Sequence, residues 1–257
     1  MIRIAAAGDL HFGTDSAGSL RPALETLPER ADVLLLAGDL TKMGAPEEAS
    51  VLAQELAGLA VPVMAVLGNH DYHSDREDDV AAAMEGVGVR ILEGSGEVVD
   101  VGNVRLGVAG AKGFGGGFAG AHGTEFGEPE MKAYVRYSRE QAAGLEAALE
   151  DVLARGADVR VALMHYSPVR ETLQGEPLEI YPFLGSYLLA EAVDRAGADL
   201  ALHGHAHRGR ERGTTAGGVT VRNVAQPVIN RAFSIYCLEP AGGRVDREGA
   251  SRAASGI

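Results

Sequence analysis

Short apolar runs alternate along the first part of the chain with segments of helical periodicity. Each run is followed by a polar cluster that contains glycine and aspartate, asparagine or histidine. Residues 19–30 and 46–59 lie between the runs, and in the second of these segments Pro46 suits the first helical turn. Strands that alternate with helices indicate βαβ units and a largely parallel sheet. The three predicted strands are residues 2–7, 33–37 and 63–67.

The middle of the chain has a different pattern. The runs 89–92, 97–101 and 104–109 are short and lie close together. Gly94-Ser95-Gly96 separates the first two, and Gly102-Asn103 separates the last two. Closely spaced runs with glycine between them predict hairpins with antiparallel pairing.

Beyond residue 110 the alternation of strands and helices returns. Helices are predicted near 134–155 and 185–195, and strands at 159–164, 199–202, 219–224 and 233–238. We expect residues 1–240 to form one α/β domain. The small and polar residues 241–257 are expected to be a poorly ordered tail.

Composition indicates an ordinary globular protein. The 257 residues are 46% hydrophobic and 23% charged, and no apolar run approaches the roughly 18 residues of a membrane span. The first residues lead straight into a strand pattern rather than a signal peptide, so we expect a cytoplasmic protein that does not bind membranes. The single cysteine, Cys237, excludes an internal disulfide and a zinc site built of several thiolates.

The formal net charge of −13 argues against binding of nucleic acid over a broad surface, which needs a basic stripe. It does not argue against a small phosphorylated substrate, because bound metal ions supply positive charge that a residue count leaves out.

Residues that bind metal ions follow five of the predicted strands. In parallel α/β sheets the carboxyl ends of the strands converge on one edge, where sites are built. Seven side chains there offer oxygen or imidazole ligands and no thiolate, a set that suits manganese, iron or zinc. Two ions that share one carboxylate need about this number of ligands. The seven are Asp9, His11, Asp39, Asn69, His165, His205 and His207.

Local spacing supports one cluster. The Asp9-x-His11 and His205-x-His207 pairs place both side chains on one side of an extended segment or tight loop. Glycines precede the ligands, and we expect them to let the backbone turn sharply beside the ions. These glycines are Gly8, Gly38, Gly68 and Gly204.

The ordered series of motifs resembles the calcineurin-like metallophosphoesterase superfamily, over residues 8 to 207. The motifs are Asp9-x-His11, Gly38-Asp39, Gly68-Asn69-His70-Asp71, His165 and Gly204-His205-x-His207. The resemblance implies a four-layer α/β/β/α sandwich of two mixed sheets flanked by helices. It also implies two divalent ions, manganese or iron in the first place, with zinc, nickel and cobalt as alternatives.

The resemblance further assigns roles. One ion would be held by Asp9, His11, Asp39 and His207, and the other by Asp39, Asn69, His165 and His205, so that Asp39 bridges them. His70 would be the acid or electrostatic partner of the leaving group, with Asp71 orienting it. A hydroxide that bridges the two ions would attack the phosphate ester.

Aspartate after Asn69-His70 resembles the phosphodiesterase and nuclease branches, and the length resembles small bacterial enzymes of the cyclic-nucleotide phosphodiesterase type. We therefore expect a small-molecule phosphodiester as substrate. A nuclease is the alternative within the enzyme class, and the acidic charge argues against it. A metal-binding scaffold subunit without catalysis is the alternative outside that class; proteins of that kind typically lack a ligand or the catalytic histidine.

Three further features have an open role. His203 lies beside the ligand pair and outside the motif, so we expect a structural or supporting role. The glycine-rich residues 113–117 lack the context of a phosphate-binding loop, which favours a lid or a surface loop. Residues 175–186 form either a packed connection or a wall of the substrate pocket, with Tyr181 as the candidate contact.

Overall fold

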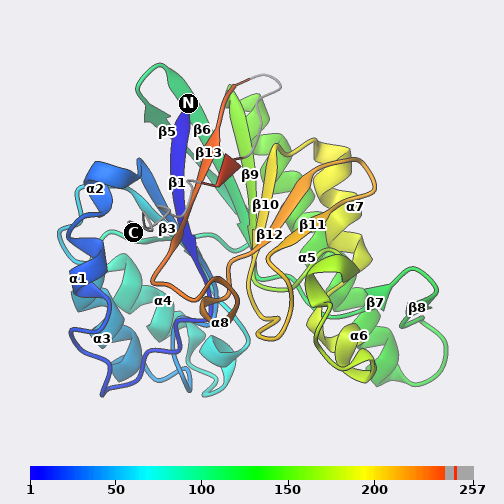
Figure 1. Cartoon of the computed structure of the whole chain (residues 1–257). Helices are drawn as coiled ribbons and strands as arrows, with labels where there is room; N and C mark the ends of the chain where they lie inside the picture. Colours follow the sequence, from blue (N-terminus) through cyan, green and yellow to red (C-terminus); the bar gives the residue numbers. More distant parts are fainter. Residues whose placement is uncertain (241–245, 248–257) are drawn as a thin grey trace, which may run out of the picture.

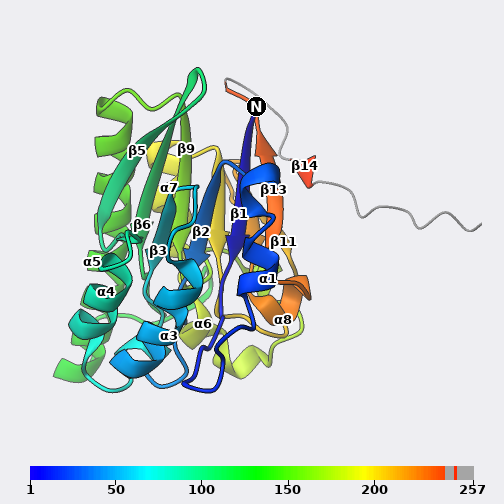
Figure 2. The same ribbon diagram turned by 90° about the vertical axis from the view of Figure 1, so that its left-hand side faces the viewer.

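Two six-stranded sheets lie face to face, and helices cover both outer faces, in the computed structural model of the chain (Figures 1 and 2). The structure describes residues 1–240 and 246–247. The layers are therefore helix, sheet, sheet and helix, and the predicted four-layer sandwich of mixed sheets is confirmed.

The first sheet has the strand order β14-β13-β1-β2-β3-β4. Strands β1 to β4 are parallel, whereas β13 runs antiparallel to β1 and β14 antiparallel to β13. Its strands are β1 (Ile2–Ala7), β2 (Val33–Ala37), β3 (Val63–Val66), β4 (Arg90–Ile91), β13 (Ser234–Leu238) and β14 (Asp246–Arg247).

The second sheet has the order β11-β12-β10-β9-β6-β5, with a parallel centre and one antiparallel strand at each edge. Its strands are β5 (Ser95–Val101), β6 (Val104–Ala111), β9 (Val159–Met164), β10 (Leu200–His203), β11 (Arg212–Thr214) and β12 (Thr220–Asn223). A separate small hairpin pairs β7 (Gly117–Phe118) with β8 (Ala121–His122).

Helices α1 to α4 pack on the outer face of the first sheet, and α5 and α7 pack on the second. The α-helices are α1 (Arg21–Leu24), α2 (Leu27–Arg30), α3 (Pro46–Leu56), α4 (Glu77–Glu85), α5 (Pro129–Ala154), α6 (Tyr181–Leu184), α7 (Tyr187–Ala196) and α8 (Gln226–Ile229). Short 3₁₀ helices are η1 (His70–Tyr72), η2 (Arg170–Leu173) and η3 (Leu178–Ile180).

Alternation along the strands builds the cores. In β1, Ile2 and Ile4 point into the layer between the sheets, whereas Ala5 and Ala7 face the helices. Because successive side chains of a strand point to opposite faces, strands buried on both faces read as continuous apolar runs. Those runs position the polar carboxyl ends of the strands at one edge of the molecule.

Two local expectations are wrong. Residues 19–30 form two short helices rather than one, because Pro28 has no N–H to donate and its ring would clash with the carbonyl of Leu24 in a continuous helix. Residues 89–92 do not pair in a hairpin; β4 lies parallel to β3 in the first sheet. Of the three runs, only the second and third form the predicted antiparallel pair, as β5 and β6 of the second sheet.

The expectation that residues 241–257 form a poorly ordered tail lies largely outside the described residues. Of residues 241–257, the structure describes only 246–247, which form β14. Among the described residues, none of the helices combines the length and the apolar character that crossing a membrane requires.

Candidate metal centre

The predicted ligands come together where the strands of both sheets end. Six of the seven form two groups of side chains suited to a metal ion, and within each group the possible ligand atoms lie within 4.8 Å of one another. Asp39 belongs to both groups. We call the first the open group (Asp9, His11, Asp39 and His207) and the second the closed group (Asp39, His165 and His205).

Unusual backbone conformations shape these loops. Asp9, His11, Asp39 and His205 all have positive φ, between 45° and 69°, a region that costs a non-glycine residue about 1–2 kcal/mol. Backbone hydrogen bonds from Asp9 N to Gly38 O (2.9 Å) and from His11 N to Asp39 O (3.0 Å) hold the first two. Left-handed non-glycine residues concentrate at functional sites, where the surrounding structure enforces them.

The glycines beside the ligands are needed mainly because a larger side chain would not fit there. Sharp turns of the backbone are the lesser reason. Of the four predicted for this purpose, Gly38 has a positive φ and the other three do not. A Cβ atom at Gly68 would lie 2.1 Å from Asp39 Oδ1, and one at Gly204 would lie 2.3 Å from Asp9 Oδ2. Only glycine lets the backbone approach both carboxylates this closely.

In the closed group, His165 has one orientation. Its Nδ1 lies 2.8 Å from Ala37 O and donates to it, because a carbonyl can only accept. The lone pair of Nε2 then faces Asn69 Oδ1 at 3.0 Å and Asp39 Oδ1 at 3.3 Å. Three acceptor atoms that converge on one point repel one another unless a cation lies among them, so these donors fit a metal ion. Asn69, the seventh predicted ligand, thus joins this group.

His205 is held in a similar way. Its Nε2 lies 3.3 Å from Phe183 O, so an Nε2–H donates there and Nδ1 carries the lone pair. Burial lowers the pKa of His205 to about 3, so the ring is neutral at ordinary pH. A neutral imidazole with a fixed tautomer is the form that binds metal ions.

The open group is less buried. Both carboxylate oxygens of Asp9 accept from His205 N, at 2.9 and 3.0 Å, and Oδ1 lies 2.8 Å from His207 Nε2. His11 Nε2 lies 3.4 Å from His207 Nε2 and 3.7 Å from Asp39 Oδ2. The hydrogen bond with Asp9 raises the pKa of His207, whereas burial lowers that of His11.

Asp39 lies between the groups and is almost fully buried. Its Oδ1 faces His165 and accepts from His70 N at 2.9 Å, while its Oδ2 faces His11. Burial raises the pKa of Asp39, but the neighbouring His165 and the hydrogen bond from His70 N lower it by more, so the pKa lies below the ordinary value. Asp39 is therefore a carboxylate with one oxygen toward each group.

His70 lies on the side of the open group. Its ring centroid is 4.5 Å from that of His11, and its Nδ1 lies 2.6 Å from Lys42 O, to which it donates. The bond to this carbonyl fixes the ring and leaves Nε2 for a substrate.

Asp71 is predicted to orient the His70 ring, and its carboxylate is bonded to backbone and hydroxyl groups of the neighbouring loops. The Asp71 carboxylate is fully buried and accepts from Thr41 N (2.9 Å), Thr41 Oγ1 (2.6 Å), Leu40 N (3.1 Å) and Gly68 N (2.8 Å). Buried N–H groups in tight loops need an acceptor, and Asp71 provides one for both loops. Asp71 is therefore a positioning residue.

His203 lies outside both groups, in agreement with a supporting role. It is fully buried, and its Nδ1 lies 2.7 Å from Gly204 O and its Nε2 2.9 Å from Thr172 Oγ1. Burial lowers its pKa to about 3. A neutral His203 thus ties the turn before His205 to η2.

The glycine-rich residues 113–117 and the segment 175–186, for which the sequence left the role open, pack against each other. Gly116 N donates to Pro182 O (2.7 Å) and Gly117 N to Gly185 O (2.9 Å). The glycine-rich stretch is thus largely buried rather than a surface loop. Tyr181 is buried and its hydroxyl donates to Leu173 O at 3.0 Å, so the hydroxyl is not free for a substrate, while the residue lines a small cavity beside α6.

Sequence reasoning missed the carbonyl oxygens of Ala37, Lys42 and Phe183, which fix three histidine rings. A backbone carbonyl exists at every position, so no residue type marks the ones that matter.

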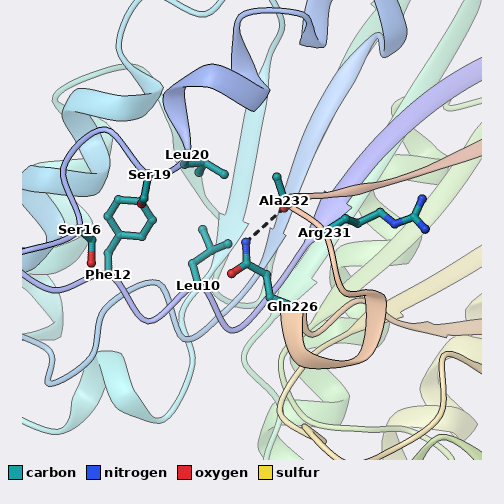
Figure 3. A pocket seen from close by; sticks show the side chains of 8 residues that line it. All are labelled: Leu10, Phe12, Ser16, Ser19, Leu20, Gln226, Arg231 and Ala232. Carbon is teal, nitrogen blue, oxygen red and sulfur yellow. Dashed lines mark hydrogen bonds between the residues drawn. The ribbon is translucent and has the colours of Figure 1, made fainter.

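A cavity of about 350 Å³ adjoins the His11 loop, between residues 10–20 and α8 (Figure 3). Leu10 and Phe12 flank His11 and line it, while the Arg231 guanidinium is directed away from Leu10. Its lining includes none of the seven predicted ligands.

Comparisons with known structures agree with this architecture. The phosphopantetheinyl hydrolase of Mycobacterium tuberculosis is 18% identical with a TM-score of 0.62, over 86% of this chain and 88% of that one. The protein TT1561 of Thermus thermophilus is 17% identical with a TM-score of 0.58, over 91% and 93% of the two chains. The calcineurin-like phosphoesterase YfkN of Bacillus subtilis is 15% identical with a TM-score of 0.52, over 96% and 87%. At these identities the likeness shows the fold.

No curated protein sequence matches the chain. The sequence model of the calcineurin-like phosphoesterases matches residues 2–209, which contain every predicted ligand and both sheets' central strands. The chain belongs to the calcineurin-like phosphoesterase family, whose members are metal-dependent phosphoesterases.

Proposed function

We propose that this chain hydrolyses a small phosphodiester with the help of two divalent metal ions that share Asp39. The position of Asp39 carries the proposal, because its two carboxylate oxygens face the closed and open groups separately. A carboxylate with one oxygen toward each of two ligand sets could serve as a ligand in both of them.

The residues that would hold the ions follow from the two groups. Aspartate, asparagine and histidine donors favour manganese or iron, and zinc, cobalt or nickel fit the same donor set. Two divalent ions bound there would supply hydroxide at neutral pH and neutralise the charge that builds up on the phosphoryl group. After subtraction of Asp9 and Asp39, the ligand shell would keep a charge of about +2 for an anionic substrate.

His70 is the residue that we assign to the leaving group. Lys42 O holds its Nδ1, so a protonated Nε2 would donate to the departing oxygen, a contribution of typically about 10²–10⁴-fold in rate. The Asp71 carboxylate would keep the loops of Thr41 and Gly68 in place beneath that ring.

A phosphodiester is favoured by aspartate after Asn69-His70, and a small molecule by the net charge of −13. The experiment that tests this proposal compares the turnover of bis-p-nitrophenyl phosphate with that of p-nitrophenyl phosphate after reconstitution of the protein with Mn²⁺. We expect faster turnover of the diester, with two Mn²⁺ per chain by elemental analysis. Glu140→Gln, which alters an exposed carboxylate on α5, provides a control outside the centre.

The rival functions give different results. Hydrolysis of single-stranded DNA at a rate far above that of the small diester would favour a nuclease. Zero turnover of both esters with manganese, iron, cobalt and nickel, despite two bound ions, would favour a scaffold.

A further inference from the structure

Exposed apolar side chains gather at the end of the molecule that carries the metal centre. Among the described residues, eight large hydrophobic side chains are markedly exposed. Met1 and Leu153 lie at the opposite end, where β1 begins and α5 ends. The other six lie on loops, on the short helices η3 and α6 or at the start of α5, at the carboxyl ends of the strands. These six are Met43, Phe126, Met131, Leu178, Ile180 and Phe183.

Phe183 contacts the metal centre through its backbone. Its side chain is 61% exposed, although its carbonyl accepts the Nε2–H of His205 at 3.3 Å. A residue whose backbone contacts a predicted ligand thus presents an aromatic ring to solvent. An isolated exposed phenylalanine needs no explanation, but one whose carbonyl contacts a ligand of the closed group is a candidate contact for a substrate.

The segment around Phe183 is firmly held. Pro182 O accepts from Gly116 N (2.7 Å) and from Tyr134 Oη (2.8 Å), and Leu184 O accepts from Ser167 N (3.0 Å). The exposed ring is therefore carried by a fixed backbone. A preorganised apolar contact loses little entropy when a ligand binds.

A small apolar cavity of about 150 Å³ continues from this segment toward the β7–β8 hairpin, which lies beside α6 at the lower right of Figure 1. Its lining is largely apolar and consists of Phe118, Ala121, Arg170, Leu178, Tyr181 and Pro182. Its volume suits a few methylene groups or the edge of an aromatic ring. The recess thus adjoins α6, the short helix that also carries Phe183.

We propose that Phe183 and the Leu178 recess form the subsite for an apolar substituent of the ester, so that the substrate class is phosphate esters bearing an alkyl or aryl group. The inference rests on the proposed phosphoesterase function and adds the substituent. The acidic net charge opposes adsorption to anionic bilayers, which favours individual amphiphilic molecules over a membrane surface.

Calorimetric titration of the Mn²⁺-loaded protein with methylphosphonate and n-butylphosphonate tests the subsite without need for turnover. Partial burial of three further methylene groups should make butylphosphonate bind about tenfold more tightly. Phe183→Ala should bring this ratio close to one and leave methylphosphonate affinity unchanged. Leu153→Ala, an exposed apolar residue at the far end, should keep the wild-type ratio.

The outcomes separate the two proposals. Binding of both phosphonates with equal affinity would overturn the apolar subsite and leave the phosphoryl site intact. No binding of either would count against the metal centre itself and against the subsite with it. Phe183-dependent binding to phosphatidylcholine vesicles without any butyl preference would replace the subsite with a membrane surface.

Discussion

The closed and open groups differ in how firmly the protein fixes their histidines. In the closed group, carbonyl oxygens of Ala37 and Phe183 hold His165 and His205. In the open group, His207 is exposed and pairs with the Asp9 carboxylate. A buried neutral ring is ready for a metal ion, whereas an exposed ring paired with a carboxylate favours a proton. We infer that the closed group binds its ion more tightly and that the open group exchanges its ion more readily.

Asp39→Asn should have the largest effect, because it removes the charge that the two groups share. We expect bound Mn²⁺ to fall from two per chain to one or fewer, and turnover of a diester to fall by more than the about 10²–10³-fold that loss of one electrostatic partner costs. Elemental analysis and initial rates measure both. Two tightly bound ions in this variant would show that Asp39 is not shared.

His70→Ala should come next and should leave both groups intact. We expect two ions to remain bound and turnover to fall by about 10²–10⁴-fold. His73→Ala, an exposed histidine on the same turn, is the matched control and should behave as wild type. Near-normal activity of His70→Ala would remove this residue from the mechanism.

Asp71→Asn tests the positioning role beneath both groups. An amide NH₂ cannot accept the N–H and hydroxyl donors that the carboxylate accepts, so we expect a loss of about 1–3 kcal/mol in the free energy of unfolding. Turnover should fall by about 10–100-fold with little change in KM. Denaturant unfolding and steady-state kinetics measure these changes, with exposed Asp75→Asn as the control. A normal kcat would confine Asp71 to stability.

The pH dependence of metal binding is the smallest of the expected effects, and it tests whether the open and closed groups differ. The Asp9 partner raises the pKa of His207, so protons compete with the open-group ion as pH falls through that value. Its affinity should then fall by about tenfold per pH unit. His205, with a pKa of about 3, exerts no such competition. Mn²⁺ titrations at several pH values should show one weakening site, and parallel weakening of both sites would contradict the difference.

Much of the candidate centre could be predicted from the sequence, because residue types that bind metals follow apolar runs whose carboxyl ends must meet at one edge. Asp9, Asp39 and His165 come from different strands, and the fold brings them together as expected. The four layers likewise followed from the motif resemblance.

The remaining features depend on tertiary contacts that local patterns do not encode. The pairing of β4 with β3 depends on which sheet a two-residue strand reaches, and the run 89–92 looks the same in either sheet. The bonds of Asp71 depend on which backbone N–H groups lie unpaired nearby. Phe183 is exposed and Tyr181 is buried, although they lie two residues apart on one helical turn. Composition does not predict this difference.

The sharing of Asp39 between two ions is most directly tested by electron paramagnetic resonance of the protein loaded with two equivalents of Mn²⁺. We predict the multiline signal of two exchange-coupled ions in the wild type and its loss in Asp39→Asn. A wild-type spectrum of isolated Mn²⁺ at full loading would contradict a shared carboxylate and the proposed hydrolysis with it.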